Sequence, residues 1–340
     1  MRDPQAREGT ERPVRVSYVL STRNRADLLD RALAGARELV GREDELIVVD
    51  GGSTDRTAAV VEAHADIVSV FLSEPDTGEA HGLNRGLLRA RGRFIKQLTD
   101  DDLFFAGAMR EAIATLEAHP EIDALVCGGE AHEFDAATGR TRPVEYRFLP
   151  AGLRLRDDVA YVMRYTQCGL GLVLRRRALE RAGLFDTTFR AVDTDYMARL
   201  IACGLDFRYL NVKLFRHVTY PHSGQHLEAE CLRDRARVLV RSGAWSRIEE
   251  AHDPDALARA LGLDAVAHGR ALARVIWSAE RLRRTPLGAL LRPAAAALGA
   301  AARVRGYLGR AVRRVLPAGR PGHPGAVDLA VEPEWDGSLR

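Results

Sequence analysis

Short runs of hydrophobic residues alternate with helical patterns along the first hundred residues of the chain. Four runs rich in β-branched and aromatic residues predict strands, and apolar residues between them recur at helical spacing, as at Leu28, Leu29 and Leu33. Such alternation predicts an α/β fold with a mainly parallel central sheet flanked by helices. The four predicted strands span residues 14–20, 45–49, 67–72 and 94–98.

The pattern becomes less regular after the fourth strand and then changes type. Residues 128–150 indicate a hairpin and residues 213–226 a mixed loop, while residues from 232 onward show the Leu, Val and Ala spacing of helices. Further helices are expected at 106–119, 155–165, 177–182 and 193–203, and further strands at 124–127, 171–174 and 207–212. We therefore predict a disordered N-terminus (1–13), an α/β domain (14–230), a basic helical C-terminal extension (231–320) and a disordered tail (321–340).

Composition places the chain among ordinary globular proteins. It has 340 residues, of which 46% are hydrophobic and 29% charged, and its net charge of +3 gives no reason to expect a nucleic-acid partner. The four cysteines form no CxxC pair, which is typical of reduced thiols in a cytoplasmic protein. We expect no signal peptide in residues 1–13, and no run of about 18 apolar residues predicts a membrane span.

Positive charge is concentrated near the end of the chain. Residues 281–320 contain ten arginines and no acidic residue, among Leu, Ala and Val, which is a basic amphipathic pattern. Three interpretations follow: peripheral binding to an anionic membrane surface, a helical layer packed on the first domain, or pairing of two subunits as a homodimer. We favour the membrane surface, on the cytoplasmic face.

Polar residues follow each of the first four predicted strands, where ligands bind in open α/β sheets. After the first, Thr22 and Arg23 offer a hydroxyl group and a planar donor fork to a diphosphate or ribose. After the second, Asp50 could accept hydrogen bonds from a ribose or from the imide of a base. No GxGxxG or GxxxxGK[ST] motif is present, so the usual dinucleotide and P-loop sites are not expected.

The fourth strand ends in three consecutive carboxylates, Asp100, Asp101 and Asp102. Adjacent negative charges repel one another, so a fold keeps them together where solvent or a cation offsets the repulsion. The triplet is therefore either a solvated acidic cap of the next helix or a site for a cation.

Five stretches of this chain resemble the family 2 glycosyltransferases that have the glycosyltransferase A fold. Ser21 stands where that family usually has Pro, and Thr99 where its first acidic residue often stands. The stretches are VSYVLSTRNRADLLDRAL (16–33), ELIVVDGGSTDRT (45–57), SEPDTGEAHGLNRGLLRARGRFI (73–95), QLTDDDLFFAGAM (97–109) and, more weakly, AGLFDTTFRAVDTDYMARLIACG (182–204).

The resemblance implies a metal-dependent inverting transferase that moves a sugar from a nucleotide-sugar donor, most commonly a UDP-sugar, to a glycan, lipid-linked or small-molecule acceptor. It assigns Mg²⁺ or Mn²⁺ to the acidic triplet, with Asp101 as the leading ligand and Asp100 or Asp102 beside it. A divalent cation with oxygen ligands would neutralise charge on the leaving nucleoside diphosphate. His222, or alternatively His226 or His217, could reach back to the metal or diphosphate.

The same resemblance assigns roles outside the triplet. Asp50 would read the nucleotide base, Asp76 would help to hold the nucleoside or sugar, and Arg85 is a candidate diphosphate or sugar contact. Asp193 matches the general base that takes the proton of the acceptor hydroxyl, with Asp195 beside it. An N-terminal helix cap is the alternative for this pair. A nucleotidyltransferase, a non-catalytic nucleotide-sugar or glycan-binding protein and a retaining transferase are the competing functions.

Overall fold

The computed structural model describes residues 13–149, 168–189, 192–220, 332 and 334–339. The predicted helix at 155–165, the whole basic region at 231–320, His222 and His226 lie outside these residues. The first part of the domain contains β1 (Val16–Thr22), α1 (Ala26–Ala36), β2 (Glu45–Asp50), α2 (Thr57–Ala63), β3 (Val70–Ser73), α3 (Glu79–Leu87) and β4 (Phe94–Leu98). The second contains β5 (Leu103–Phe104), α4 (Ala106–Ala118), β6 (Ala124–Asp135), β7 (Arg140–Arg147), α6 (Cys168–Gly171), β8 (Leu172–Arg175), α7 (Arg176–Ala182), α8 (Val192–Ala202) and β9 (Phe207–Thr219).

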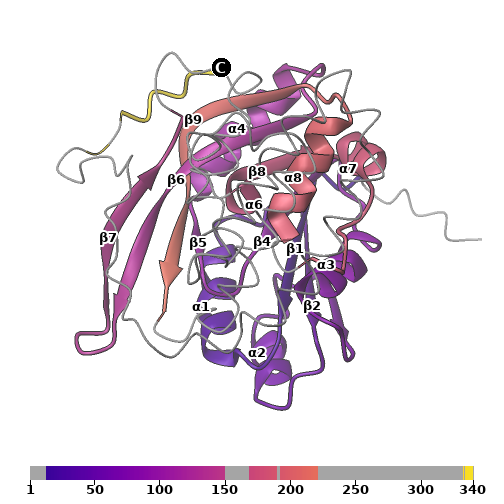
Figure 1. Cartoon of the computed structure of the whole chain (residues 1–340). Helices are drawn as coiled ribbons and strands as arrows, with labels where there is room; N and C mark the ends of the chain where they lie inside the picture. Colours follow the sequence, from indigo (N-terminus) through magenta and orange to yellow (C-terminus); the bar gives the residue numbers. More distant parts are fainter. Residues whose placement is uncertain (1–12, 150–167, 190–191, 221–331, 333, 340) are drawn as a thin grey trace, which may run out of the picture.

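One nine-stranded sheet runs through the domain, in the order β3-β2-β1-β4-β8-β6-β9-β5, with β7 paired to β6. The strands β3, β2, β1 and β4 are parallel, as are β6 and β9. Strand β8 pairs antiparallel with both β4 and β6, and β7 and β5 also pair antiparallel. The predicted α/β fold is confirmed, and its largest parallel block is β3-β2-β1-β4. The β6–β7 hairpin extends away from the body of the domain (Figure 1).

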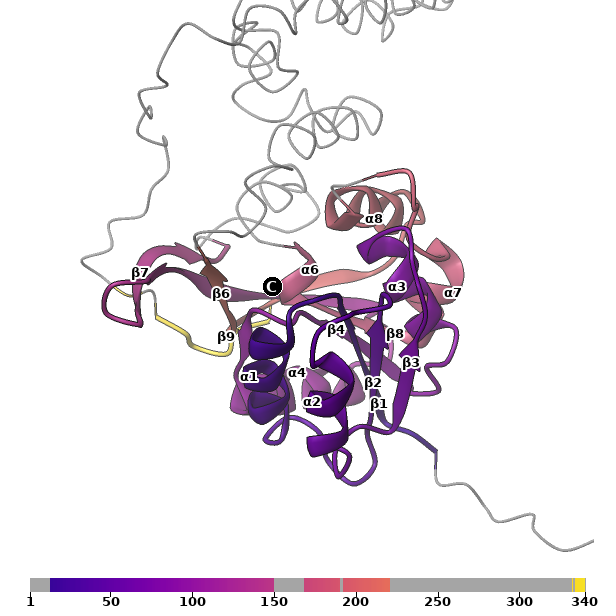
Figure 2. The ribbon, with the colours of Figure 1, turned by 90° about the horizontal axis from the view of Figure 1, so that it is seen from below.

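Helices cover both faces of the sheet because successive side chains of a strand point to opposite faces. Val19, Ile47 and Val49 pack with residues of α3, α7 and α8, while Leu20, Leu46 and Val48 pack with residues of α1, α2 and α4. Figure 2 shows α1, α2 and α4 on one side of the sheet and α3, α7 and α8 toward the other. The continuous apolar run of β2, which is buried throughout, reflects this burial on two faces.

Two strands differ from the sequence prediction. Strand β9 continues to Thr219, into the region predicted as a mixed loop, because it pairs with β6 from Ala124 to Glu133 and with β5. Strand β6 likewise continues into the hairpin, to Asp135. The added part of β9 alternates buried Leu214 with less buried charged residues, a weaker signal than a continuous apolar run.

The last residues of the chain differ from the predicted disordered tail. Residues 334–339 lie against the domain, and Leu339 forms an antiparallel bridge with Leu210 of β9. Backbone hydrogen bonds join Asn211 to Ser338 (2.9 Å) and to Gly337 (3.0 Å). The sequence, rich in Gly and acidic residues, carries no periodic signal for this docking.

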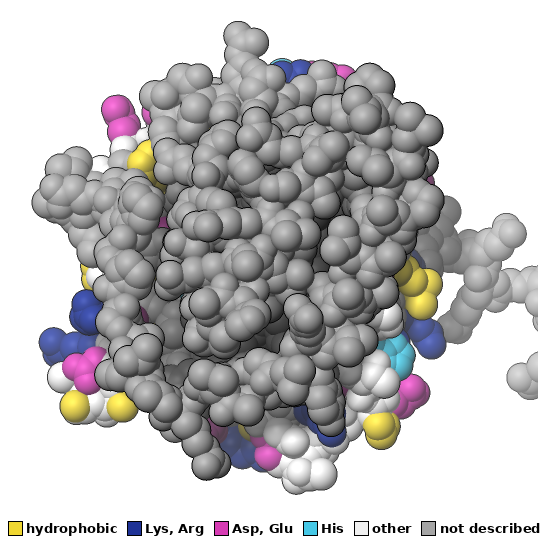
Figure 3. All heavy atoms as spheres, viewed as in Figure 1, with side chains coloured by type: hydrophobic (Ala, Val, Ile, Leu, Met, Phe, Trp, Pro, Cys, Tyr) yellow, Lys and Arg dark blue, Asp and Glu magenta, His cyan; other side chains and the backbone are white. Residues whose placement is uncertain are grey.

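No helix in the described part of the chain is both long enough and apolar enough to cross a membrane. The described side chains that are visible in Figure 3 lie around the margin of that face, where basic and acidic groups are next to each other. Ion pairs between exposed side chains, such as Arg142–Glu133 and Arg37–Asp66, also bring the two signs together. In the residues described, exposed charges of both signs are therefore interspersed.

Candidate functional site

The parallel register brings the loops after β1, β2 and β4 to one edge of the sheet. Thr22 pairs with Asp50 of β2, and Leu20 pairs with Leu98 of β4, so all three strands end at nearly the same level. Residues that are 75 or more positions apart in the sequence consequently become neighbours. The acidic triplet lies in this group, directly after β4.

Asp100 and Asp101 are held by the last residue of β1 and by Arg25 in the loop after it. Thr22 Oγ1 donates a hydrogen bond to Asp100 Oδ2 (2.7 Å). The guanidinium of Arg25 bridges the two carboxylates, with Nη1 2.6 Å from Asp100 Oδ1 and Nη2 2.5 Å from Asp101 Oδ2. Arg25 therefore supplies the positive charge that keeps two adjacent carboxylates together in this structure.

Burial works against ionisation of both carboxylates. Desolvation raises the pKa of Asp100 to about 6, although the neighbouring Arg25 lowers it and Asp101 raises it further. Desolvation, followed by the charge of Asp102, also raises the pKa of Asp101. A cation that enters the site would therefore stabilise the ionised form of both carboxylates.

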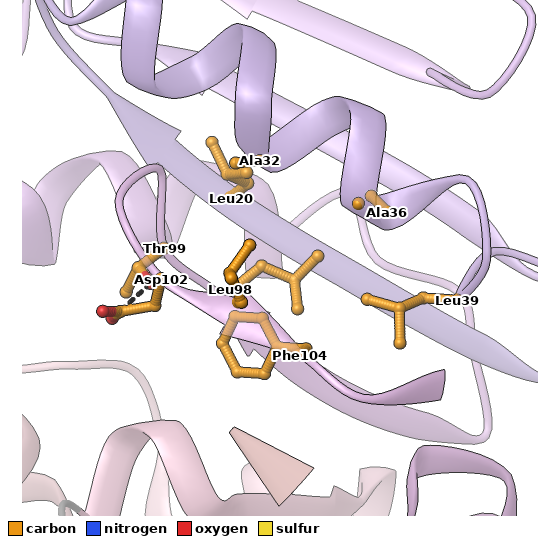
Figure 4. Close-up of a pocket in the computed structure, with 10 residues that line it drawn as sticks. Leu20, Ala32, Ala36, Leu39, Leu98, Thr99, Asp102 and Phe104 are labelled. Carbon is orange, nitrogen blue, oxygen red and sulfur yellow. Dashed lines mark hydrogen bonds between the residues drawn. The ribbon is translucent and has the colours of Figure 1, made fainter. Parts of the chain in front are cut away.

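Asp102 faces a different set of partners. Its Oδ1 accepts hydrogen bonds from the backbone N–H of Val218 and lies 2.9 Å from Nδ1 of His217, while Oδ2 accepts from Thr99 Oγ1 (2.7 Å). A small apolar pocket lies between α1 and the loop after β4, and in Figure 4 the carboxylate of Asp102 is at its edge, next to Thr99 and away from Leu39. Of the three candidate histidines, His217 is the one that the described residues include, and it contacts the triplet.

Asp50 is buried and its carboxylate is used inside its own loop. Ser53 donates to it through its backbone N–H (3.0 Å) and its hydroxyl group, and Ser73 Oγ donates to Oδ2 (2.7 Å). A nucleotide would have to share or displace these donors. Arg23 is exposed, and within the described part of the chain it has no hydrogen-bond or ion-pair partner.

Asp76 and Arg85 shape the loop between β3 and α3. Asp76 Oδ1 accepts the backbone N–H of Gly78 (3.0 Å), and its Oδ2 is 2.7 Å from where a Cβ on Gly51 would lie. Arg85 donates to the backbone carbonyl of Glu74 (2.9 Å) and pairs with its carboxylate (2.9 Å). Arg85 thus stabilises the loop. Because Gly51, directly after β2, has no side chain, the carboxylate of Asp76 can lie close to the end of β2.

The two carboxylates of α8 differ in burial and in their partners. Asp195 is 1% exposed and pairs with Arg199 one turn later (2.9 Å), which in turn donates to the carbonyl of Ala182 (2.8 Å). Asp193 is exposed and accepts the backbone N–H of Thr194 (2.7 Å). Asp195 therefore has a packing role here, and Asp193 is the carboxylate that a ligand could reach.

Glu79, at the start of α3, lies close enough to Asp193, Asp100 and Asp101 for their charges to act on it. Gln97 Nε2 donates to Glu79 Oε1 (3.4 Å), and Gly169 is close to both Gln97 and Asp193. The side chain of Glu79 remains accessible to solvent, yet protein surrounds it closely enough that desolvation, with the charges of Asp193, Asp100 and Asp101, raises its pKa to about 7. Four carboxylates from β4, α3 and α8 consequently share one region.

A divalent cation suits the chemistry of these donors. Asp100, Asp101 and Asp102 offer hard carboxylate oxygens of the kind that Mg²⁺ and Mn²⁺ prefer. Among the described residues, however, no three His, Cys, Asp or Glu side chains are arranged to hold a metal ion. The ligand types fit a cation, while the Asp100 and Asp101 oxygens are turned toward Arg25.

Sequence reasoning missed Arg25 and Glu79. Arg25 lies two residues after the exposed Arg23, and only the β1–β4 register indicates which of the two meets the triplet. Glu79 looks like an ordinary acidic residue in the first turn of a helix. The feature that could have identified Glu79 is the position of α3, which follows β3 at the same edge of the sheet as the acidic triplet.

Comparison with known proteins identifies the family and the fold of the chain. Residues 17–183 match the model of "Glycosyl transferase family 2". Poly-beta-1,6-N-acetyl-D-glucosamine synthases of Staphylococcus aureus (strain MSSA476) and Staphylococcus epidermidis (strain RP62A) are each 22% identical over 197 residues. The match covers 57% of this chain and 47% of each synthase, so the chain corresponds to about half the length of these relatives.

Solved structures share the fold. S. aureus TarS 1–349 in complex with UDP-GlcNAc superposes with a TM-score of 0.57 at 18% identity, covering 84% of this chain and 88% of that one. The same fragment in complex with UDP gives a TM-score of 0.53 at 19% identity, covering 84% and 87%. The predicted glycosyltransferase A fold is therefore confirmed.

Proposed function

Residues 17–183 belong to the family 2 glycosyltransferases, and from this premise we propose that the chain is a metal-dependent inverting enzyme that transfers a sugar from a nucleoside diphosphate to an acceptor hydroxyl. The observation that carries the proposal is the closeness of the acidic triplet to the accessible carboxylate of Asp193: Gln97, near the end of β4, contacts Glu79, and Gly169 is close to both Gln97 and Asp193. One group of carboxylates would serve the donor, and the other the acceptor.

On the donor side, Asp101 and Asp102, with Asp100 beside them, would hold Mg²⁺ or Mn²⁺. The cation would supply Lewis-acid stabilisation of charge on the leaving diphosphate. Thr22 and Asp76 would position the nucleoside and diphosphate, and Asp50 would accept from the base or ribose once its loop partners rearrange. The His217 ring, which lies beside Asp102, would contact the metal or the diphosphate, and His222 is the alternative for this role.

On the acceptor side, Asp193 would accept the proton of the attacking hydroxyl in a single displacement. Asp195 would fix the first turn of α8 through Arg199 instead of touching the substrate. A UDP-sugar is the proposed donor class, since UDP and UDP-GlcNAc bind to the fold neighbour TarS. The acceptor would be a glycan, a lipid-linked molecule or a small molecule.

The first prediction separates donor and acceptor functions. Asp101→Asn should abolish Mn²⁺-dependent release of UDP from UDP-GlcNAc, because it removes a carboxylate from the proposed cation site. Asp193→Asn should keep UDP binding within a few fold of wild type while transfer falls by about 10²–10⁴-fold, the usual loss on removing a general base. UDP release and UDP binding are measured on the same preparations.

Asp66→Asn is the matched control, since Asp66 is an exposed, paired carboxylate near the opposite edge of the sheet. Full turnover by Asp193→Asn would refute its role as base. UDP-sugar binding without any release in wild type, across a panel of acceptors, would favour the non-catalytic alternative. Pyrophosphate release from a nucleoside triphosphate would favour a nucleotidyltransferase.

We also propose that the Arg-rich residues 281–320 bring the enzyme to an anionic membrane surface. The support is the sequence itself, with ten arginines and no acidic residue in forty positions. A lipid-linked acceptor would suit this location on the cytoplasmic face. A homodimer formed by the same region is the competing proposal.

A further inference from the structure

The end of the chain returns to the strand from which residues 221–331 depart. Glu332 and residues 334–339, here named the C-terminal segment, contact β9 and β6. Strand β9 ends at Thr219, and the segment pairs with its first half (Figure 1). About 110 residues separate the two attachments.

Asn211 is the centre of this contact. Its backbone N–H donates to Ser338 O, and its carbonyl accepts from the N–H of Gly337. Its side-chain Nδ2 donates to the carbonyl of Glu334 (2.8 Å) and to Asp336 Oδ1 (2.6 Å). Asn211 thus makes four hydrogen bonds to the segment, two through its backbone and two through its nearly buried side-chain amide, and the bond to Asp336 is the one that depends on the sequence of the segment.

A bulge in β9 makes Asn211 available. Cys127 of β6 pairs with Leu210, but the next residue, Gly128, pairs with Lys213. Asn211 and Val212 are therefore extra residues on β9 and have no partner on β6 in this ladder. The polar groups of Asn211 can then turn toward a second chain segment.

Gly128 provides room for an aromatic ring at the same place. A Cβ on Gly128 would lie 2.4 Å from Cζ3 of Trp335, so a larger residue could not occupy this position. The Trp335 ring packs edge-on against Phe148, with centroids 6.4 Å apart. Lys213 pairs with Glu332, and Gly337 adopts the positive φ (67°) that lets the segment turn back toward β9.

We propose that the β9 bulge, Gly128 and Phe148 form a peptide-binding site that selects the Trp335-Asp336-Gly337 sequence of the chain's own C-terminal segment. Apolar burial of Trp335 supplies affinity, and the amide of Asn211 supplies specificity. The site is separate from the acidic triplet and does not depend on the proposed transferase function.

The length of the tether sets the affinity that the site needs. A tethered ligand has an effective concentration of about millimolar for short linkers, and less for longer ones. With about 110 intervening residues, the segment stays bound in most molecules only if the free peptide has a Kd well below about 1 mM. The site should therefore bind an equivalent peptide added in solution.

The experiment uses a fluorescein-labelled peptide of residues 331–340 and anisotropy titrations against the full chain. Trp335→Ala weakens the binding of the chain's own segment to the site. This variant should therefore bind the added peptide with a Kd below about 100 μM. Wild type should bind the peptide at least about tenfold more weakly, because its own segment competes. Adding Asn211→Ala to Trp335→Ala should also weaken binding at least about tenfold, because the amide contacts are lost.

Trp335→Ala/Arg142→Ala is the matched control, since Arg142 is exposed on the β6–β7 hairpin of the same sheet. A peptide with Trp335 replaced by Ala should not bind, and hydrogen exchange at Gly337 should be slow in wild type and fast in Trp335→Ala. Equal binding by Trp335→Ala and its Asn211→Ala derivative would overturn the proposal.

Discussion

At the scale of single residues, two arginines two positions apart have opposite environments. Arg23 is exposed and without a partner in the described residues, whereas Arg25 bridges Asp100 and Asp101. The charge of Arg25 occupies the place where the resemblance expects a divalent cation. Arg25 and the cation should therefore compete for the same two carboxylates.

Arg25→Met tests this competition without any donor. Removing the guanidinium leaves two largely buried carboxylates uncompensated, so Mn²⁺ should bind the nucleotide-free variant at least about tenfold more tightly than wild type, a difference of about 1.4 kcal/mol. Electron paramagnetic resonance of free Mn²⁺ measures the affinity directly. Mn²⁺ should also raise the melting temperature of the variant more than that of wild type.

Arg23→Met is the matched control and should bind Mn²⁺ as wild type does. Weaker Mn²⁺ binding by Arg25→Met would mean that Arg25 organises the carboxylates for the cation. In that case, the two would not compete.

At the scale of elements, sequence patterns were sufficient where burial is continuous. Strand β2 was predictable because both faces of the sheet are covered there, which requires an uninterrupted apolar run from Leu46 to Val49. The second half of β9 was missed because Lys213 and Arg216 interrupt its apolar residues. Both charged side chains pair with Glu130 of the neighbouring strand.

Some residues of the candidate site were likewise predictable from the sequence, and others were not. The triplet, Asp50 and Asp193 were identifiable from local motifs, but their partners were not. Arg25 meets Asp100 across 75 positions, and His217 meets Asp102 across 115. Such contacts depend on strand register and on an extension of β9 that no local pattern indicates.

Strand β4 contains a buried lysine that carries a prediction of its own. Lys96 is fully buried, and its Nζ donates to the carbonyls of Leu170 (2.6 Å) and Leu172 (3.3 Å), which join α6 and β8 to β4. Burial lowers the pKa of Lys96 to about 7. The folded chain therefore binds fewer protons than the unfolded chain between about pH 7 and 10.

Stability contributed by Lys96 should consequently rise with pH over this window, because the unfolded state holds the extra proton. Relative to Lys96→Met, the unfolding free energy of wild type should increase by about 2 kcal/mol from pH 7 to pH 9. Urea denaturation of both proteins at the two pH values measures it. Burial also raises the pKa of Tyr18, but Tyr18 is present in both proteins, so its contribution cancels in the difference between their unfolding free energies. A pH-independent difference would show that Lys96 stays charged in the fold.

At the scale of the whole molecule, charge is distributed unevenly. The chain has 50 basic and 47 acidic residues, yet the charged residues of 281–320 are all basic. Exposed charges of the described domain form ion pairs such as Arg37–Asp66 and Arg142–Glu133, and both signs occur side by side at the margin of the face in Figure 3. Electrostatic binding to an anionic surface should therefore depend on the C-terminal arginines far more than on those of the domain.

Vesicle flotation of the full chain tests this dependence. It should bind vesicles of phosphatidylcholine with phosphatidylserine but not phosphatidylcholine alone, and added salt should release it, because screening shortens the range of the attraction. Changing Arg303, Arg305, Arg313 and Arg314 to Gln should weaken binding by several kcal/mol, at about 1 kcal/mol per arginine near the surface. The matched control changes four exposed domain arginines, Arg31, Arg89, Arg140 and Arg142, and should bind as wild type does. Equal losses in the two variants would show that net charge alone governs the interaction, and unchanged binding in both would exclude an electrostatic membrane contact through residues 281–320.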